Sequence, residues 1–156
     1  MQIWVDADAC PKPVRDVLIR AARRLGLQTT FVANQFLQLP VSPFIRMLMV
    51  AKGFDVADDR IAMELTAGDL VVTADVPLAA EVVRRDALAL NPRGTLYSTD
   101  NVAEHLARRN LLEELRSSGQ VSGGPAALGK ADIQAFANQL DRLLTRHIRL
   151  KSEGSS

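Results

Sequence analysis

Apolar residues along the chain occur in two alternating patterns, short continuous runs and longer sets at helical spacing. The continuous runs, apolar or β-branched, are typical of buried strands and lie at residues 3–5, 29–32, 47–50, 69–73 (which begins with Asp69) and 88–90, although the run at 47–50 is short enough to fit a helix as well. The helically spaced sets predict helices at residues 13–25, 58–66, 77–86, 100–116 and 132–150. Strands that alternate with helices favour a three-layer α/β/α fold with a mainly parallel sheet. In such sheets, ligands bind beyond the carboxyl ends of the strands, where the strand order reverses.

The length and composition are those of one soluble domain. The chain has 156 residues, of which 47% are hydrophobic and 24% charged, so residues 1–150 are expected to form a single domain and residues 151–156 a disordered tail. No apolar run approaches the roughly 18 residues of a membrane span, and the first residues lack the basic flank and apolar stretch of a signal peptide. The single cysteine, Cys10, cannot form an intramolecular disulfide and is expected to be a small buried hydrophobe. Together these features predict a cytoplasmic protein.

Charge is distributed unevenly along the chain. The 19 basic and 18 acidic residues leave a net charge of only +1, which does not by itself indicate a nucleic-acid partner. Residues 55–75 nevertheless carry a local charge of −5, while basic residues are dense in the first helix and near the end of the chain. This separation indicates a cation site with phosphate-friendly surroundings, although a solvated acidic loop would have the same composition.

Acidic residues follow the predicted strands at the points where those strands end. Asp6 and Asp8 close the first strand two residues apart, so in an extended chain both side chains would face the same way. Asp75 follows a later strand, and Asp58 and Asp59 begin the helix before it. We therefore expect these carboxylates to gather at one edge of the sheet.

A divalent cation is the expected partner of these carboxylates. Crowded like charges raise each other's pKa, and Mg²⁺ or Mn²⁺ relieves the crowding because both ions prefer oxygen ligands. Asp69 is excluded from the site, because six residues of extended strand place it about 20 Å from Asp75, at the opposite edge. The predicted metal ligands are Asp6, Asp58, Asp59 and Asp75, and the predicted catalytic residues are Asp6, Asp8 and Asp75.

The same residues have a structural alternative. Asp8 and Asp58 could cap helices, and Asp75 could bind the turn that leads into Pro77. A bound cation could instead position a phosphate, generate hydroxide from water and stabilise a departing oxygen. Convergence of several carboxylates on one edge favours the metal site over capping.

Four segments also carry a family resemblance. Residues 3–11, 53–58, 68–80 and 123–125 resemble the bacterial YaiI/YqxD family, and the resemblance extends from residue 2 to about residue 148. That family is similar to PIN-domain proteins, whose activity is typically metal-dependent RNA cleavage. The resemblance therefore implies a PIN-like fold and RNA as the partner, single-stranded rather than duplex.

PIN-like sites use acidic residues at the ends of the first and fourth strands and one on a helix between them. In this sequence the matching residues are Asp6, Asp75 and one of Asp58 or Asp59. The roles of Asp8, Asp55 and Cys10, which belong to the narrower family pattern, stay open, as does that of the loop at 117–130.

Other functions fit the sequence less well. Asp6-Ala7-Asp8 is similar to the nucleophile motif of haloacid-dehalogenase-like phosphatases, but Cys10 stands where that motif has Thr or Val, and no lysine lies between residues 53 and 75. Residues 124–130 have the spacing of a phosphate-binding loop, but Ala131 replaces the Ser or Thr that would hold magnesium. A catalytically silent RNA-associated protein of the same fold is the remaining alternative to a nuclease.

Overall fold

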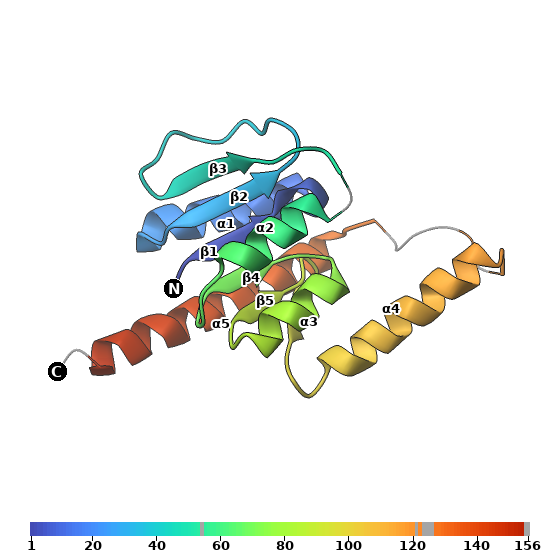
Figure 1. Cartoon of the computed structure of the whole chain (residues 1–156). Helices are drawn as coiled ribbons and strands as arrows, with labels where there is room; N and C mark the ends of the chain where they lie inside the picture. Colours follow the sequence, from blue (N-terminus) through green and yellow to red (C-terminus); the bar gives the residue numbers. More distant parts are fainter. Residues whose placement is uncertain (54, 121, 123–126, 155–156) are drawn as a thin grey trace.

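A central sheet with helices on both faces forms the body of the molecule (Figure 1). The structure is a computed structural model, and it describes residues 1–53, 55–120, 122 and 127–154. The described strands are β1 (Ile3–Asp6), β2 (Thr29–Ala33), β3 (Ile45–Met49), β4 (Leu70–Val72), β5 (Leu88–Leu90) and β6 (Leu96–Tyr97). The described helices are α1 (Lys12–Leu25), α2 (Val56–Glu64), α3 (Val76–Arg84), α4 (Val102–Ser117) and α5 (Lys130–Gly154), with a 3-10 turn at Ala7–Ala9.

The strand order places the reversal of the sheet at its centre. The strands lie in the order β3-β2-β1-β4-β5-β6. β1 to β5 are parallel and only β6 pairs antiparallel, in the described part of the chain. The chain builds outward from β1 through β2 to β3, and then returns to pair β4 against the other side of β1. The crevice between the carboxyl ends of β1 and β4 is therefore the topological switch point, where sheets of this kind bind ligands.

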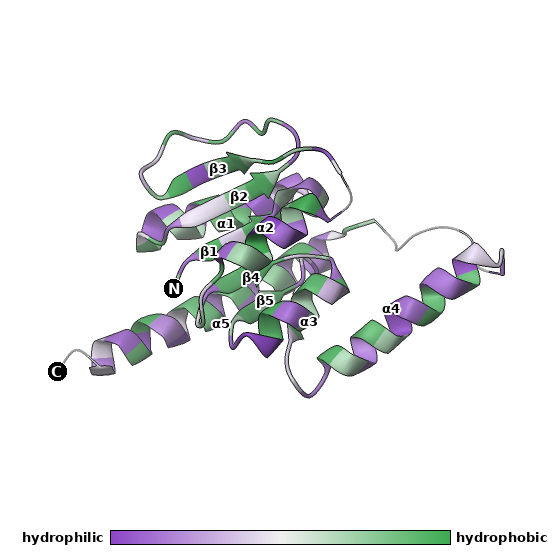
Figure 2. Cartoon of the chain, viewed as in Figure 1, coloured by the Kyte–Doolittle hydropathy of each residue, from purple (hydrophilic) through white to green (hydrophobic). Residues whose placement is uncertain are grey.

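Alternation along the strands divides the core into two layers. Ile3 and Val5 pack on one face with α1 and α5, whereas Trp4 packs on the other face with α2 and α3. Figure 2 shows the strands as mostly hydrophobic and the helices as banded, which is the pattern of amphipathic helices on a buried sheet. The three-layer α/β/α prediction is confirmed.

The turn between β5 and β6 fixes the start of α5. Gly94 has φ +94°, and a Cβ there would lie 2.7 Å from the backbone carbon of Ala135, so only glycine fits this close approach. Arg93 extends from the same turn and pairs with Asp132 of α5 at 2.9 Å. The short strand β6, which the sequence pattern did not reveal, follows this turn.

Several predicted boundaries differ from the structure, three of them in ways that matter for the fold or the site. The strand predicted at 47–50 is confirmed as a strand, but it begins two residues earlier, at Ile45. The first strand ends at Asp6 and turns into the 3-10 segment, so the chain is not extended through Asp8. The last helix continues to Gly154 and thus enters the segment 151–156 that was expected to be disordered.

One helix stands apart from the body. α4 has no buried residue and packs against α3. Figure 1 shows it projecting away from the sheet. None of the described helices is both long and apolar enough to cross a membrane.

Candidate metal centre

The candidate site lies at the switch point, beginning with the last residue of β1. Asp6 follows Trp4 by two positions, so its side chain is directed to the α2 and α3 face of the sheet. It is only 8% exposed. The hydroxyl of Thr73, just after β4, donates to Asp6 Oδ2 at 3.0 Å, which ties together the ends of the two central strands.

Asp75 is fixed at the start of α3. Its Oδ1 accepts the backbone N–H of Leu78 at 2.8 Å, the bond of an N-cap residue, and Pro77 stands in the first turn of this helix. Its own N–H donates to the Thr73 hydroxyl at 3.0 Å. Asp75 therefore has the capping bond that the structural alternative allowed, and this bond does not exclude ligation because a carboxylate can accept at several further positions.

The start of α2 brings two more carboxylates to the same place. Asp55 precedes the helix with φ 63°, a left-handed conformation that aspartate tolerates better than most residues. Asp58 lies in the first turn of the helix. Carboxylate oxygens of Asp55, Asp58 and Asp75 lie within 4.8 Å of one another, so the three side chains could share one cation.

Like charges and burial shift the pKa of the central pair upward. Burial raises the pKa of Asp6, and the carboxylates of Asp75 and Asp8 raise it further, while hydrogen bonds with Thr73 and Asp58 oppose the shift. Burial, together with the charges of Asp6 and Asp75, raises the pKa of Asp58 from 3.8 to about 8. The site therefore holds more negative charge than it can keep ionised at neutral pH without a positive partner.

The structure separates the remaining predicted residues from this group. Asp59 is exposed beside Asp58 and is not part of the group of three. Asp8 is exposed and lies in the 3-10 turn, where its Oδ2 accepts the N–H of Asn34 after β2 at 2.9 Å, so it does not follow Asp6 in an extended strand. Asp69 lies at the other end of β4, as predicted.

An open cleft lies over the carboxylates. It has a volume of about 490 Å³ and reaches from α2 and α3 to α4. Its charged lining consists of Asp55, Asp58, Asp59, Asp75, Glu81, Glu113 and Arg109. Arg109 is the only basic residue among these described lining residues, and it pairs with Glu113 at 2.6 Å.

The cysteine beside the site is chemically quiet. Cys10 is buried in the core beneath α1, which confirms the prediction of a small buried hydrophobe. Burial raises the pKa of its thiol to about 12, and the charge of Asp6 adds to the shift against the opposing effect of Arg15. The thiol therefore stays protonated and is not a nucleophile.

Sequence reasoning left two residues of this site without a role. The position of Asp55 before the acidic helix is visible in the sequence. Its left-handed backbone conformation, which brings it near Asp58, cannot be predicted from hydrophobic periodicity. Thr73 is not acidic, so the pattern of carboxylates does not point to it. Its hydroxyl nevertheless donates to Asp6 and accepts the N–H of Asp75. The glycine-rich motif at 123–125 lies outside the described residues.

These observations define a class: an α/β protein with a parallel sheet and an acidic cleft at its switch point. Within that class, the chain belongs to the YaiI/YqxD family, because the family model described as "Uncharacterized BCR, YaiI/YqxD family" matches residues 4–146. The chain is 58% identical over 146 residues to a UPF0178 protein from Dechloromonas aromatica (strain RCB), which covers 94% of this chain and 97% of that protein. It is 54% identical over 148 residues to a UPF0178 protein from Syntrophotalea carbinolica, which covers 95% and 100% of the two chains.

Proposed function

We propose that this protein is a metal-dependent phosphodiesterase that cleaves RNA, single-stranded in preference to duplex. The observation that carries the proposal is the convergence of Asp55, Asp58 and Asp75 within 4.8 Å, next to the buried carboxylate of Asp6. These side chains come from the end of β1, the start of α2 and the end of β4, which is the distribution expected from the PIN-like resemblance.

The donor set fits Mg²⁺ or Mn²⁺. All the candidate ligands are carboxylates, the oxygen donors that these ions prefer. We propose Asp6, Asp58 and Asp75 as metal ligands, and we add Asp55 because its carboxylate lies with those of Asp58 and Asp75. Asp59 lies outside this group of three and is the less suitable ligand. When bound, a divalent cation supplies charge neutralisation at the phosphate and a lowered pKa for water.

The chain's own residues have distinct roles in this proposal. Thr73 holds Asp6 in position through its hydroxyl, and the N–H of Leu78 holds one oxygen of Asp75. Asp8, anchored by the N–H of Asn34, is the proposed residue that orients water or moves a proton. Arg109 gives the cleft a positive group that can face a phosphate.

The phosphatase alternative receives less support. Its motif has Thr or Val two residues after the second aspartate, whereas Cys10 stands there and is buried in the core. The described lining of the cleft also contains no lysine to balance a phosphoryl group.

The proposal is tested by cleavage of a labelled single-stranded oligoribonucleotide. We expect cleavage with Mn²⁺ or Mg²⁺, none in EDTA, and no hydrolysis of p-nitrophenyl phosphate. Asp6→Asn and Asp75→Asn should each lower the rate more than about 100-fold, since residues that only orient a ligand already cost about 10–100-fold. Asp59→Asn, which removes the same charge from the lining of the same cleft, is the matched control and should retain most of the activity.

The other candidate functions give different results in the same assay. A silent RNA-associated protein would shift the oligonucleotide without cutting it, and a phosphatase would act on p-nitrophenyl phosphate instead. Cleavage that survives both aspartate substitutions, or that persists in EDTA, would refute the proposed activity.

A further inference from the structure

α4 turns one face toward the body of the molecule. Val102 and Leu106 line a hollow together with residues of α3. The ring of His105 packs edge-on against the tyrosine of β6. Arg109 and Glu113 line the acidic cleft. These five residues follow one another at steps of one, three or four positions, so they form a single stripe, the inner face of the helix.

The opposite face of α4 is largely exposed. With about 100° of rotation per residue, Leu111 lies about 180° from the middle of the inner face. Leu111 is 55% exposed, and Ala107 and Leu115, four positions before and after it, extend the apolar line. Arg108 and Glu114 flank this line on its two sides. These five residues form the outer face of α4.

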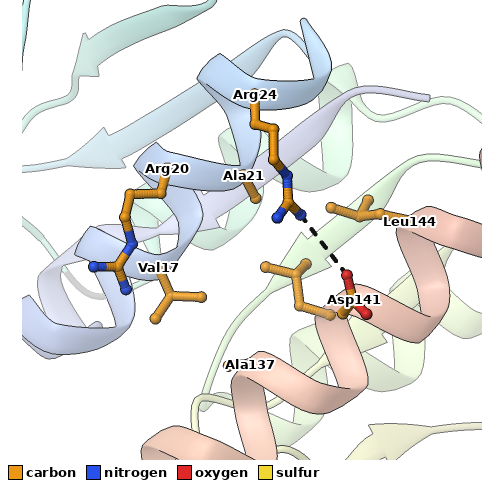
Figure 3. A pocket seen from close by; sticks show the side chains of 8 residues that line it. Val17, Arg20, Ala21, Arg24, Ala137, Asp141 and Leu144 are labelled. Atoms are coloured by element: carbon orange, nitrogen blue, oxygen red, sulfur yellow. Dashed lines mark ion pairs between the residues drawn. The ribbon is translucent and has the colours of Figure 1, made fainter.

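Figure 3 shows, for comparison, how another long helix of the molecule is covered. Leu144 of α5 lies across a small hollow from Val17 and Ala21 of α1, beside the ion pair of Arg24 with Asp141. Leu144 is only 1% exposed. Short helices are marginally stable in water and depend on such packing of an apolar face. The outer face of α4 has a similar apolar line that stays exposed, which makes it a contact surface.

The outer face of α4 is complementary to itself. If two copies of the helix run antiparallel about a two-fold axis at Leu111, residues equally far before and after Leu111 come to the same level of the pair. Ala107 then meets Leu115 of the second copy, a small side chain against a large one, and Arg108 comes to the level of Glu114. A parallel pair would instead set each charge at the level of its own copy.

The charges of the outer face are available for this pairing. The side chain of Arg108 is 61% exposed and pairs with Glu104 of the same helix at 3.2 Å, an exposed contact that contributes little and can be exchanged. Glu114 is exposed, and none of the ion pairs between described residues involves it.

We propose that the outer face of α4 is a dimer interface, which binds α4 of a second copy of this chain in antiparallel orientation, centred on Leu111. Each inner face turns toward its own body, so the two bodies lie on opposite sides of the helix pair. α4 has 16 residues and is about 24 Å long. A contact of this length is small, so the dissociation constant is expected in the micromolar range. Pairing also steadies one wall of the acidic cleft, because Arg109 and Glu113 belong to the same helix.

Sedimentation equilibrium of the full chain in EDTA, across micromolar protein concentrations, tests the interface apart from the proposed metal and RNA chemistry. The test variant is Leu111→Glu, which puts two like charges at the two-fold axis. Its matched control, Leu112→Glu, makes the same change one residue on, about 100° away around the helix, where the side chain is 37% exposed. Glutamate favours helix, and circular dichroism would establish that both variants keep their helices.

We expect the parent protein and Leu112→Glu to form dimers. Leu111→Glu should have a dissociation constant at least about 100-fold higher, since residues at the centre of an interface carry most of its binding energy. A parent protein that stays monomeric throughout this range would overturn the proposal. So would dimerisation of Leu111→Glu at the parental strength, or an equal loss in both variants.

The charges test the antiparallel register separately. Arg108→Glu and Glu114→Arg each set like charges at the same level, so each variant alone should dimerise at least about tenfold more weakly than the parent. An equal mixture of the two variants restores opposite charges at both levels and should dimerise as strongly as the parent. No recovery in the mixture would overturn the antiparallel pairing.

Discussion

The two ends of β4 place the same residue type in opposite environments. Asp69, before the strand, is 3% exposed and accepts hydrogen bonds from the N–H of Gln2, the indole of Trp4, and both the N–H and hydroxyl of Thr66. Asp75, after the strand, uses one oxygen as a helix cap and shares its surroundings with Asp55 and Asp58.

The two carboxylates differ in the groups that surround them. Donors surround Asp69, so its negative charge stabilises the folded chain and joins β1 to the loop before β4. Carboxylates surround Asp75, so its charge adds to repulsion that the protein alone does not cancel. The chemistry of their neighbours distinguishes the two residues best, since hydrogen-bond donors contact Asp69 and other carboxylates lie beside Asp75.

The largest effect on stability is expected at the amino end of β4. Asp69→Ala leaves the Trp4 indole and the Gln2 N–H without their acceptor, and buried donors left unpaired cost about 1–3 kcal/mol each. We expect a loss of roughly 3 kcal/mol or more in the free energy of unfolding. Urea denaturation followed by the fluorescence of Trp4, the one tryptophan of the chain, measures it. A loss below about 1 kcal/mol would show that these bonds contribute little.

A divalent cation bound at the carboxyl end of β4 is expected to raise the free energy of unfolding, by an amount comparable to the loss expected for Asp69→Ala. Mg²⁺ or Mn²⁺ at about 100 times its dissociation constant should stabilise the protein by about 2.7 kcal/mol through mass action. Asp58→Asn should remove this response, and Asp59→Asn, its neighbour on α2, should keep it. Melting curves with and without the ion provide the measurement, and a melting temperature indifferent to metal in the unsubstituted protein would support pure capping.

Acidity should stabilise the metal-free protein relative to a variant without Asp58. Burial, with the neighbouring charges of Asp6 and Asp75, raises the pKa of Asp58 from 3.8 to about 8, so the folded state binds its proton more tightly than the unfolded state does. This contribution is complete below about pH 4 and is lost as the pH rises to about 8. In EDTA, the stability advantage of the parent over Asp58→Asn should therefore shrink between pH 5 and pH 8. Parallel pH profiles for the two proteins would contradict the shift.

The smallest effect on the fold is expected at Asp8. Its one described bond, to the N–H of Asn34, is exposed, so Asp8→Asn should change the free energy of unfolding by less than about 1 kcal/mol. If Asp8 orients water or moves a proton, the substitution should lower RNA cleavage by about 10²–10⁴-fold without removing the stabilisation by Mn²⁺. Cleavage at the parental rate would remove Asp8 from the proposed mechanism.

The sequence predicted the layers of the fold and part of the site for physical reasons. β1, β2 and β4 are buried on both faces and leave continuous apolar runs, and their carboxyl ends locate Asp6 and Asp75. The two-residue strand β6 is too short to show a period. The 3-10 turn that contains Asp8 depends on the backbone conformation after Asp6, which the alternation of apolar and polar residues does not predict.

The packing of α2 also determines which of two adjacent acidic residues joins the site, a choice that composition cannot make. Asp58 and Asp59 have the same charge and the same place in a helix turn, but about 100° of helical rotation puts only Asp58 in the group with Asp55 and Asp75. The shallow packing of α4 was equally hidden, because helical spacing in its sequence does not show whether its apolar side chains become buried. The choice among adjacent acids therefore needed the packing of α2 on the sheet.

Calorimetric titration with Mn²⁺ shows whether the carboxylates beyond β1 and β4 bind a divalent cation. We expect saturable binding to the parent protein and to Asp59→Asn, and its loss in Asp58→Asn and Asp75→Asn, with all four proteins folded in the same buffer. Equal binding by Asp58→Asn, Asp75→Asn and the parent, or no binding to the parent, would contradict this expectation.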